Sequence, residues 1–206
     1  RFRNVTGVQT CALPILTSPY KSVQDLVQAA KVKPGEIRFG SGGSGSSMHV
    51  IAEVFSQKAH VKFEHIPYRS STQMVQELLA GQIDFTFQNI AVVMPFVKAG
   101  KLRALAVTSD QRFFLDPAIP TLKETGWPIV WEGGSGLLVP AGTPTAVVSK
   151  MAQDVETVLG KQEVKSALQQ NGVDSAPLKT NEFALSVREI SSQWAAVIRS
   201  SGAKVD

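Results

Sequence analysis

The sequence predicts an α/β protein in which helices flank a parallel-rich sheet. Three observations support this class. Between residues 17 and 108, segments with helical periodicity alternate with short apolar segments, and the links between them are short. Of the 206 residues, 43% are hydrophobic and 18% are charged, which is enough apolar material for a packed core. Such alternation is typical of a parallel sheet with helices on both faces.

Four helices are expected in this part of the chain, each from apolar residues at helical spacing. Ser22 is a typical N-cap for the first helix, and Pro34 stops it. Gly81 follows the third helix, where a left-handed residue commonly ends a helix. Pro95 predicts a kink in the fourth. In order, the expected helices cover residues 23–33, 47–57, 70–80 and 89–100.

Four short strands are expected between these helices. They are EIRFG at 36–40, VKFEHIPY at 61–68, QIDFTF at 82–87 and LRALAVT at 102–108. Right-handed crossovers place the carboxyl ends of such strands at one edge of the sheet. We therefore expect the loops after the strands to meet at that edge, where open α/β sheets bind ligands.

The second half of the chain is less regular. Residues 109–136 are rich in proline and glycine, and we expect them to cross between two domains. LLVPAGTP at 137–144 predicts a buried strand and a turn, followed by a helix with Thr143 as N-cap and Pro144 at its first position. A last helix is expected to begin at Thr180. This half contains too few strands for a sheet of its own.

The loop after the first strand contains a G-x-G-x-x-G sequence at Gly40, Gly42 and Gly45. A dinucleotide site would also require an acid at the end of the second strand. That end is Pro67-Tyr68, and Glu64 stands near the beginning of the strand. The loop is instead rich in serine, which favours an anion held by hydroxyls and by the free N–H groups of a helix start. A flexible turn that only caps the helix is the alternative. The candidate ligand contacts here are Ser41, Gly43, Ser44, Ser46 and Ser47.

Two further loops carry candidate ligand contacts at the same edge. Tyr68, Arg69, Ser70 and Ser71 follow the second strand, and Gln88 and Asn89 follow the third. Arginine offers a fixed positive charge, and amides can bind a ligand and cap a helix at the same time. The alternatives are an ordinary strand–helix link with a surface arginine, and an asparagine that serves only as an N-cap.

Metal and acid–base chemistry find little support. His49, His60 and His65 lack the spacing of metal ligands, and Cys11 is the single cysteine, so we expect no metal and no cofactor. We expect His49 to pack or orient at a helix start. None of the three loops contains an aspartate or a glutamate that could act as an acid or a base. This favours binding over catalysis, so we expect that the protein is not an enzyme. The net charge of +4 is scattered, so we expect no nucleic-acid partner. The sequence contains no stretch of 18 apolar residues, so it predicts no membrane-spanning helix.

The first residues stand apart from this pattern. The string VTGVQTCALPI resembles translated sequencing-adapter DNA, and it has neither helical nor strand periodicity. We therefore expect residues 1–16 to be a non-native leader.

Several separated blocks together resemble the Bug-type substrate-binding proteins of tripartite tricarboxylate transporters. These blocks, in order, are SGGSGSSMH, PYRSSTQMVQELLAGQIDFTFQN, VKAGKLRALAVTSDQR, PTLKETG and GLLVPAGTP. The resemblance implies a periplasmic-binding-protein-like fold of type II, with two domains and a further N-terminal part that is truncated here. It also implies a periplasmic location, a small carboxylate ligand, membrane components of the transporter as partners, and a monomer when full length. It places ligand contacts at 41–47, at 68–71 and at 88–89.

We therefore predict a solute-binding protein that captures a small carboxylate for such a transporter. Residues 17–124 would form a nearly complete second domain, and residues 125–206 the C-terminal part of an incomplete first domain. Two alternatives remain open: an NAD-dependent oxidoreductase that uses the loop at Gly40, Gly42 and Gly45, and a ligand-sensing module without transport.

Overall fold

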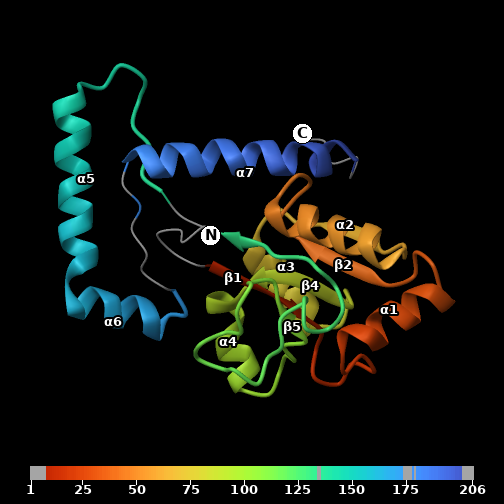
Figure 1. Ribbon diagram of the computed structural model, residues 1–206. Coiled ribbons are helices and arrows are strands. Elements are labelled where there is room, and N and C mark those ends of the chain that lie inside the picture. The colour runs from red at the N-terminus through yellow and green to blue at the C-terminus, as the bar shows by residue number, and fades with distance from the viewer. Residues whose placement is uncertain (1–7, 134–135, 174–177, 179, 201–206) are drawn as a thin grey trace.

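The computed structural model describes residues 8–133, 136–173, 178 and 180–200. Helices and strands alternate through the first half of the chain, and helices dominate the second half (Figure 1). The elements are β1 (Val8–Leu13), α1 (Val23–Val32), β2 (Arg38–Ser41), α2 (Ser47–Ala59), β3 (Glu64–Pro67), α3 (Ser71–Leu79), β4 (Phe85–Asn89), α4 (Ile90–Lys98), β5 (Ala106–Val107), β6 (Glu132–Gly133), α5 (Thr145–Gly160), α6 (Gln162–Gln170) and α7 (Thr180–Ser200).

The sheet has the strand order β3-β2-β4-β1-β5, and β6 pairs with β1. Strand β2 lies between β3 and β4 and is parallel to both, which confirms the expected parallel sheet. Strand β1 runs antiparallel to both β4 and β5, so those two strands share one direction. All four strands that were expected from the sequence therefore run the same way, and one antiparallel strand lies between the third and the fourth.

Strand β1 is the main difference from the sequence-based expectation. It lies within residues 1–16, where we found no strand periodicity, yet its backbone pairs with β4, β5 and β6. Tertiary pairing of this kind overrides local preference, because the backbone groups at the edges of β4 and β5 need partners. That residues 1–16 are non-native stays a prediction.

Helices α1 to α4 lie where the sequence predicts them. Ser22 caps α1 in a capping box with Asp25. Gly81 has φ of +73° after α3, as expected for a left-handed helix end, and Pro95 lies inside α4. The strands differ more from expectation, because β4 extends to Asn89 and β5 is only 2 residues long.

Apolar side chains form one core on each face of the sheet. On one face, α1 and α2 pack over Phe39, Phe85 and Phe87. On the other face, α3 and α4 pack over Val107. Alternation along β5 illustrates the division, because successive side chains of a strand point to opposite faces and Ala106, the neighbour of Val107, belongs to the first core.

The prediction of a buried strand within residues 137–144 is wrong. Leu137 and Leu138 are 69% and 84% exposed, and within the described part of the chain residues 137–140 pair with no strand. An apolar run becomes a buried strand only when a neighbouring strand can pair with it. The expected cap is also displaced by one residue. Pro144 is itself the N-cap of α5, while Thr143 Oγ1 donates to the Pro140 carbonyl at 2.8 Å.

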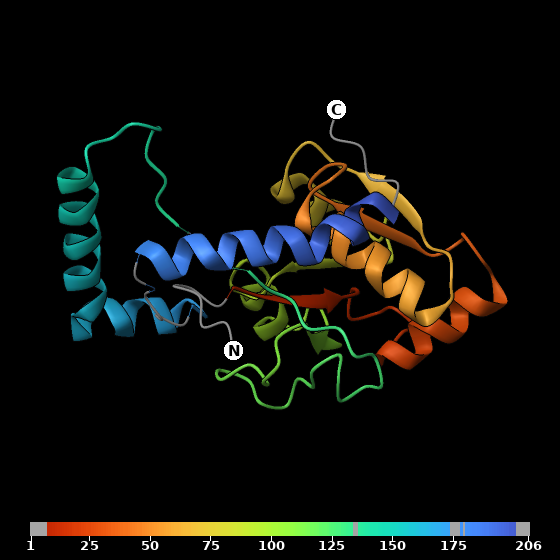
Figure 2. The ribbon, with the colours of Figure 1, turned by 45° about the horizontal axis from the view of Figure 1, so that its top comes forward.

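The three C-terminal helices differ in how they contact the sheet layer. Helix α7 begins at Thr180 as expected and passes alongside α2 (Figure 2). Its Trp194 contacts Trp131 edge to face, with ring centroids 4.3 Å apart. Helix α5 stands away from the sheet in both views, and no residue of α5 or α6 is buried. A domain boundary near residue 124 stays a prediction, and Trp127 and Ile129 pack with the first core.

The tight packing under β2 gives a stability prediction. A methyl group on Gly40 would lie 2.3 Å from Ile83 Cδ1 and 2.8 Å from Met74 Cγ, and both neighbours are buried. We expect Gly40→Ala to lower the free energy of unfolding by about 1–3 kcal/mol, as overpacked cores do. Urea denaturation of the intact protein measures this.

Gly160→Ala is the matched control, because nothing lies within 4 Å of a methyl group there. The control should leave stability unchanged or raise it slightly, since alanine favours helix. Equal stability of the Gly40 variant and the wild type would contradict the packing described here.

Candidate functional site

The three candidate loops lie at one edge of the sheet. The Tyr68 N–H donates to the Ser41 carbonyl at 2.9 Å, which joins the first loop to the second. A side chain at Gly42 would meet Ser71 Oγ at 3.2 Å. Strand β2 pairs in parallel with β4 and sets Gly40 opposite Thr86, so the residues that follow in both strands run toward the same edge. The carboxyl ends of β2, β3 and β4 therefore meet, as parallel strands require.

The glycine loop is held by its own hydrogen bonds. Gly43 and Gly45 have φ of +121° and +79°, a region that favours glycine. The Ser46 N–H donates to the Gly43 carbonyl at 3.2 Å, and Ser46 Oγ accepts from the His49 N–H to cap α2. The Gly45 N–H donates to His49 Nδ1 at 3.1 Å. The loop is thus a defined turn with a fixed helix start.

Ser41 supports this loop from inside the protein. Its side chain is fully buried, and Oγ lies 2.7 Å from His65 Nε2. The same oxygen lies 3.0 Å from the Gly43 carbonyl and 3.2 Å from the Gly43 nitrogen. Of the five candidates in this loop, Ser41 is therefore already occupied by protein groups, whereas Ser47 is exposed and Gly43, Ser44 and Ser46 are partly exposed.

A stack of rings lies beneath the glycine loop. Phe39 stacks on His65 at 4.8 Å, and His65 stacks on His49 at 3.8 Å. Burial, and to a lesser extent His49, lowers the pKa of His65 to about 4. Burial also lowers the pKa of His49 and raises the pKa of Glu53, whose Oε1 lies 3.7 Å from His49 Nε2.

Both histidines are therefore neutral near pH 7, and His49 orients the loop as expected. His65 was not predicted to support the site. The only signal in the sequence was its position inside the expected strand at 61–68, because its contact with Phe39 depends on the pairing of β3 with β2.

The second loop combines exposed and half-buried groups. Arg69 and Ser70 are exposed, whereas Tyr68 and Ser71 are half-buried. Ser70 Oγ caps α3 by accepting from the Gln73 N–H at 3.2 Å. Burial is the main cause that raises the pKa of Tyr68. Arg69 thus supplies a solvent-accessible positive charge beside a capped helix start.

The third loop begins with a buried amide. Gln88 is 2% exposed, and its Oε1 accepts from the Asn89 N–H at 2.8 Å. Asn89 Oδ1 in turn accepts from the Ala91 N–H at 2.9 Å, so Asn89 acts as the N-cap of α4. Gln88 Nε2 is buried and has no hydrogen-bond partner.

At this edge the N–H groups of Ser47 and Met48 in α2, and of Ser71 and Thr72 in α3, have no acceptor within the described part of the chain. The first N–H groups of a helix lack intrahelical partners and carry a partial positive charge. Together with Arg69, and with no carboxylate in the three loops, they make an edge that favours an anion.

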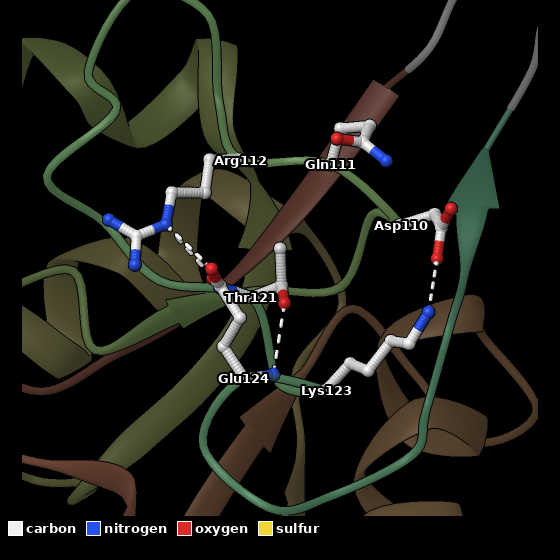
Figure 3. A pocket seen from close by; sticks show the side chains of 6 residues that line it. All are labelled: Asp110, Gln111, Arg112, Thr121, Lys123 and Glu124. Carbon is white, nitrogen blue, oxygen red and sulfur yellow. Dashed lines mark hydrogen bonds and ion pairs between the residues drawn. The ribbon is translucent and has the colours of Figure 1, made fainter.

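A hollow of about 560 Å³ lies away from the three loops and is lined by residues 110–112, 121, 123 and 124 (Figure 3). Its charged groups bind one another. Arg112 Nε donates to both carboxylate oxygens of Glu124, and Lys123 Nζ pairs with Asp110 at 3.1 Å. The Thr121 N–H, followed by Arg112, lowers the pKa of Glu124. Because these pairs satisfy each other, we prefer the loop edge as the candidate site.

Two negative findings concern the described residues alone. No three or more His, Cys, Asp or Glu side chains are grouped there so that they could hold a metal ion. In the same residues, none of the helices is both long and apolar enough to cross a membrane.

Comparisons with known proteins agree with one another. A family model described as "Tripartite tricarboxylate transporter family receptor" matches residues 3–203. A Cupriavidus necator protein described as "UPF0065 protein in gbd 5'region" is 30% identical over 97% of this chain and 61% of its own length. BugT of Bordetella pertussis is 29% identical over 98% of this chain and 63% of its own length.

Solved structures support the same fold. The structure of "R. palustris Rpa4515 with adipate" superposes with a TM-score of 0.91 at 26% identity, over 97% of this chain and 67% of that one. The structural neighbours are periplasmic binding proteins, which confirms the expected fold class. The chain spans a little over 60% of the length of the two curated relatives described above.

The buried histidine stack predicts how stability depends on pH. Below the ordinary histidine pKa of 6.5, the unfolded chain binds a proton at His65 that the folded protein does not bind until about pH 4. Stability should therefore fall as the pH drops from 6.5 to 4. The raised pKa of Glu53 acts in the opposite direction.

We expect His65→Gln to reduce this loss of stability, because glutamine does not titrate and its amide can still reach Ser41. Urea denaturation at pH 7 and at pH 4.5 measures the difference. His60→Asn is the control, because His60 is exposed and asparagine tolerates its φ of +52°. A His65 variant with the same pH dependence as the wild type would contradict the prediction.

Proposed function

Because the chain belongs to the tripartite tricarboxylate transporter receptor family, we propose that it is part of a solute-binding receptor for a small carboxylate. The observation that carries the proposal is the cluster of free N–H groups at the starts of α2 and α3, beside Arg69. Helix starts bind carboxylates because the N–H groups and the helix dipole both favour negative charge.

The ligand class is a carboxylic acid with one or more carboxylates. The relative from R. palustris was solved with adipate, a dicarboxylate, which makes the C4 to C6 dicarboxylates the first candidates. One carboxylate would be held by the loops at 41–47 and 68–71, with Gln88 and Asn89 beside it. Closure of a second domain over the bound acid would complete the capture.

The location and partners of the receptor follow from the family. We place the protein in the periplasm, as a monomer that delivers its acid to the membrane components of the transporter. No nucleic acid, metal or cofactor takes part in this function. We propose binding without catalysis, because the three loops contain no acid–base pair and the two histidines beneath them are neutral.

A dinucleotide-dependent oxidoreductase is the weaker alternative. Its ribose-binding acid should stand at the end of β3, and that end is Pro67. A ligand-sensing module would use the same binding site, so it differs in the partner and not in the ligand.

A thermal-shift series on the intact protein tests the proposal. Succinate, glutarate and adipate should raise the midpoint of unfolding in a concentration-dependent way, because a ligand that binds the folded state stabilises it. Adipamide, which has the same chain without charge, and NADH should not. No shift with any carboxylate, or a shift with NADH alone, would reject the receptor.

Replacing the exposed charge should weaken binding moderately. We expect Arg69→Gln to lower affinity for the best dicarboxylate about fivefold, or about 1 kcal/mol, because solvent screens an exposed guanidinium. Calorimetry measures the affinity. Arg188→Gln removes an equally exposed charge from α7 and should change nothing. Equal losses in the two variants would assign the effect to net charge instead of the site.

A further inference from the structure

Gln88 combines three features at the candidate site. It is the last residue but one of β4, it is 2% exposed, and its Nε2 is buried without a hydrogen-bond partner. A buried amide nitrogen without a partner is uncommon, because leaving a donor unpaired costs stability. In the described part of the chain only Arg103 and Trp127 also carry such an atom, and neither lies in the three loops. The unpaired donor at the site therefore needs an explanation.

The orientation of the Gln88 carboxamide is fixed by its neighbour. Its Oε1 accepts from the Asn89 N–H at 2.8 Å. The reversed orientation would set two donors, Nε2 and the Asn89 nitrogen, against each other, and a backbone nitrogen cannot accept. The oxygen is thus occupied by the start of α4, and the nitrogen is the group left for a ligand.

Gln88 also lies at the same sheet edge as the groups that would hold the acid. Gly42 and Gln88 each follow by two residues the paired residues Gly40 and Thr86 of two parallel neighbouring strands, and Gly42 and Asn89 are partly exposed. Gly42 in turn neighbours Ser71, whose N–H is one of the free amides. The unpaired donor and the free helix starts therefore belong to the same edge.

We propose that Gln88 is a specificity-determining residue whose Nε2 donates to an acceptor of the bound acid, so that the site prefers acids without an ammonium group. This inference rests on the proposed function and names the ligand class for the same site. An ammonium group can only donate, so it could not satisfy Nε2. It would also find no carboxylate in the loops at 41–47, 68–71 and 88–89, and the Asn89 oxygen already accepts from Ala91.

Calorimetry on the intact protein with matched pairs of acids tests the inference. The pairs are succinate with aspartate, glutarate with glutamate, and adipate with 2-aminoadipate, each differing by one ammonium group. We expect the acid without the ammonium group to bind at least tenfold more tightly in the best-bound pair. This comparison requires no variant, so it remains decisive even if a substitution prevents folding.

The variant Gln88→Glu isolates the donor. Glutamate keeps the shape and the oxygen that accepts from Asn89, and it replaces the nitrogen with an acceptor. We expect the affinity for the best dicarboxylate to fall at least tenfold, and the ratio within its pair to move toward the amino acid. Gln82→Glu adds the same charge at an exposed position before β4 and should change neither value.

The outcomes separate the two proposals. If no acid binds the wild type, both the receptor and the role of Gln88 are rejected. If dicarboxylates bind but the amino acid of the pair binds as tightly, or if Gln88→Glu leaves affinity within twofold of the wild type, the role of Gln88 alone is rejected.

Discussion

The parallel pairing of β2 with both β3 and β4 is the constraint on which the site depends. Parallel strands send their carboxyl ends to the same edge, so the three following helices begin at that edge. Each of these helices begins with a side-chain cap, from Ser46, Ser70 or Asn89. A cap satisfies one N–H and leaves others free, so one sheet edge concentrates several unpaired donors. A shift in the register of β2 would move the glycine loop away from Ser71, and the free N–H groups of α2 would then no longer lie near those of α3.

Much of this arrangement could be predicted from local sequence. Ser22, Ser46 and Ser70 are caps whose residue type and position before an apolar helical pattern identify them. The parallel direction of the sheet followed from the alternation of helices and strands. The three loops were predictable for the same reason, since each one joins an expected strand to an expected helix.

The features that sequence reasoning missed depend on contacts between distant segments. Strand β1 has no periodicity of its own, and it is a strand because β4 and β5 leave backbone groups to pair. His65 becomes important only because β3 sets it beside Phe39 and against His49. At residues 137–140 the opposite happened: a strand was predicted from the apolar sequence, but no strand forms, since the segment lacks a neighbouring strand within the described residues.

The three helix starts at the edge are unequal, and this inequality decides how the site can select. The first two residues of α2 and the first two residues of α3 keep free N–H groups, so these helices can hold any carboxylate. At α4 the Asn89 and Ala91 N–H groups are taken by the side chains of Gln88 and Asn89. Gln88 Nε2 therefore adds an unpaired side-chain donor to the backbone groups of this edge. Backbone groups are the same in every sequence, so in the proposed receptor they would recognise the charge of the acid. Discrimination among acids would then come from a side chain such as Gln88, because a change of one residue there alters the donor.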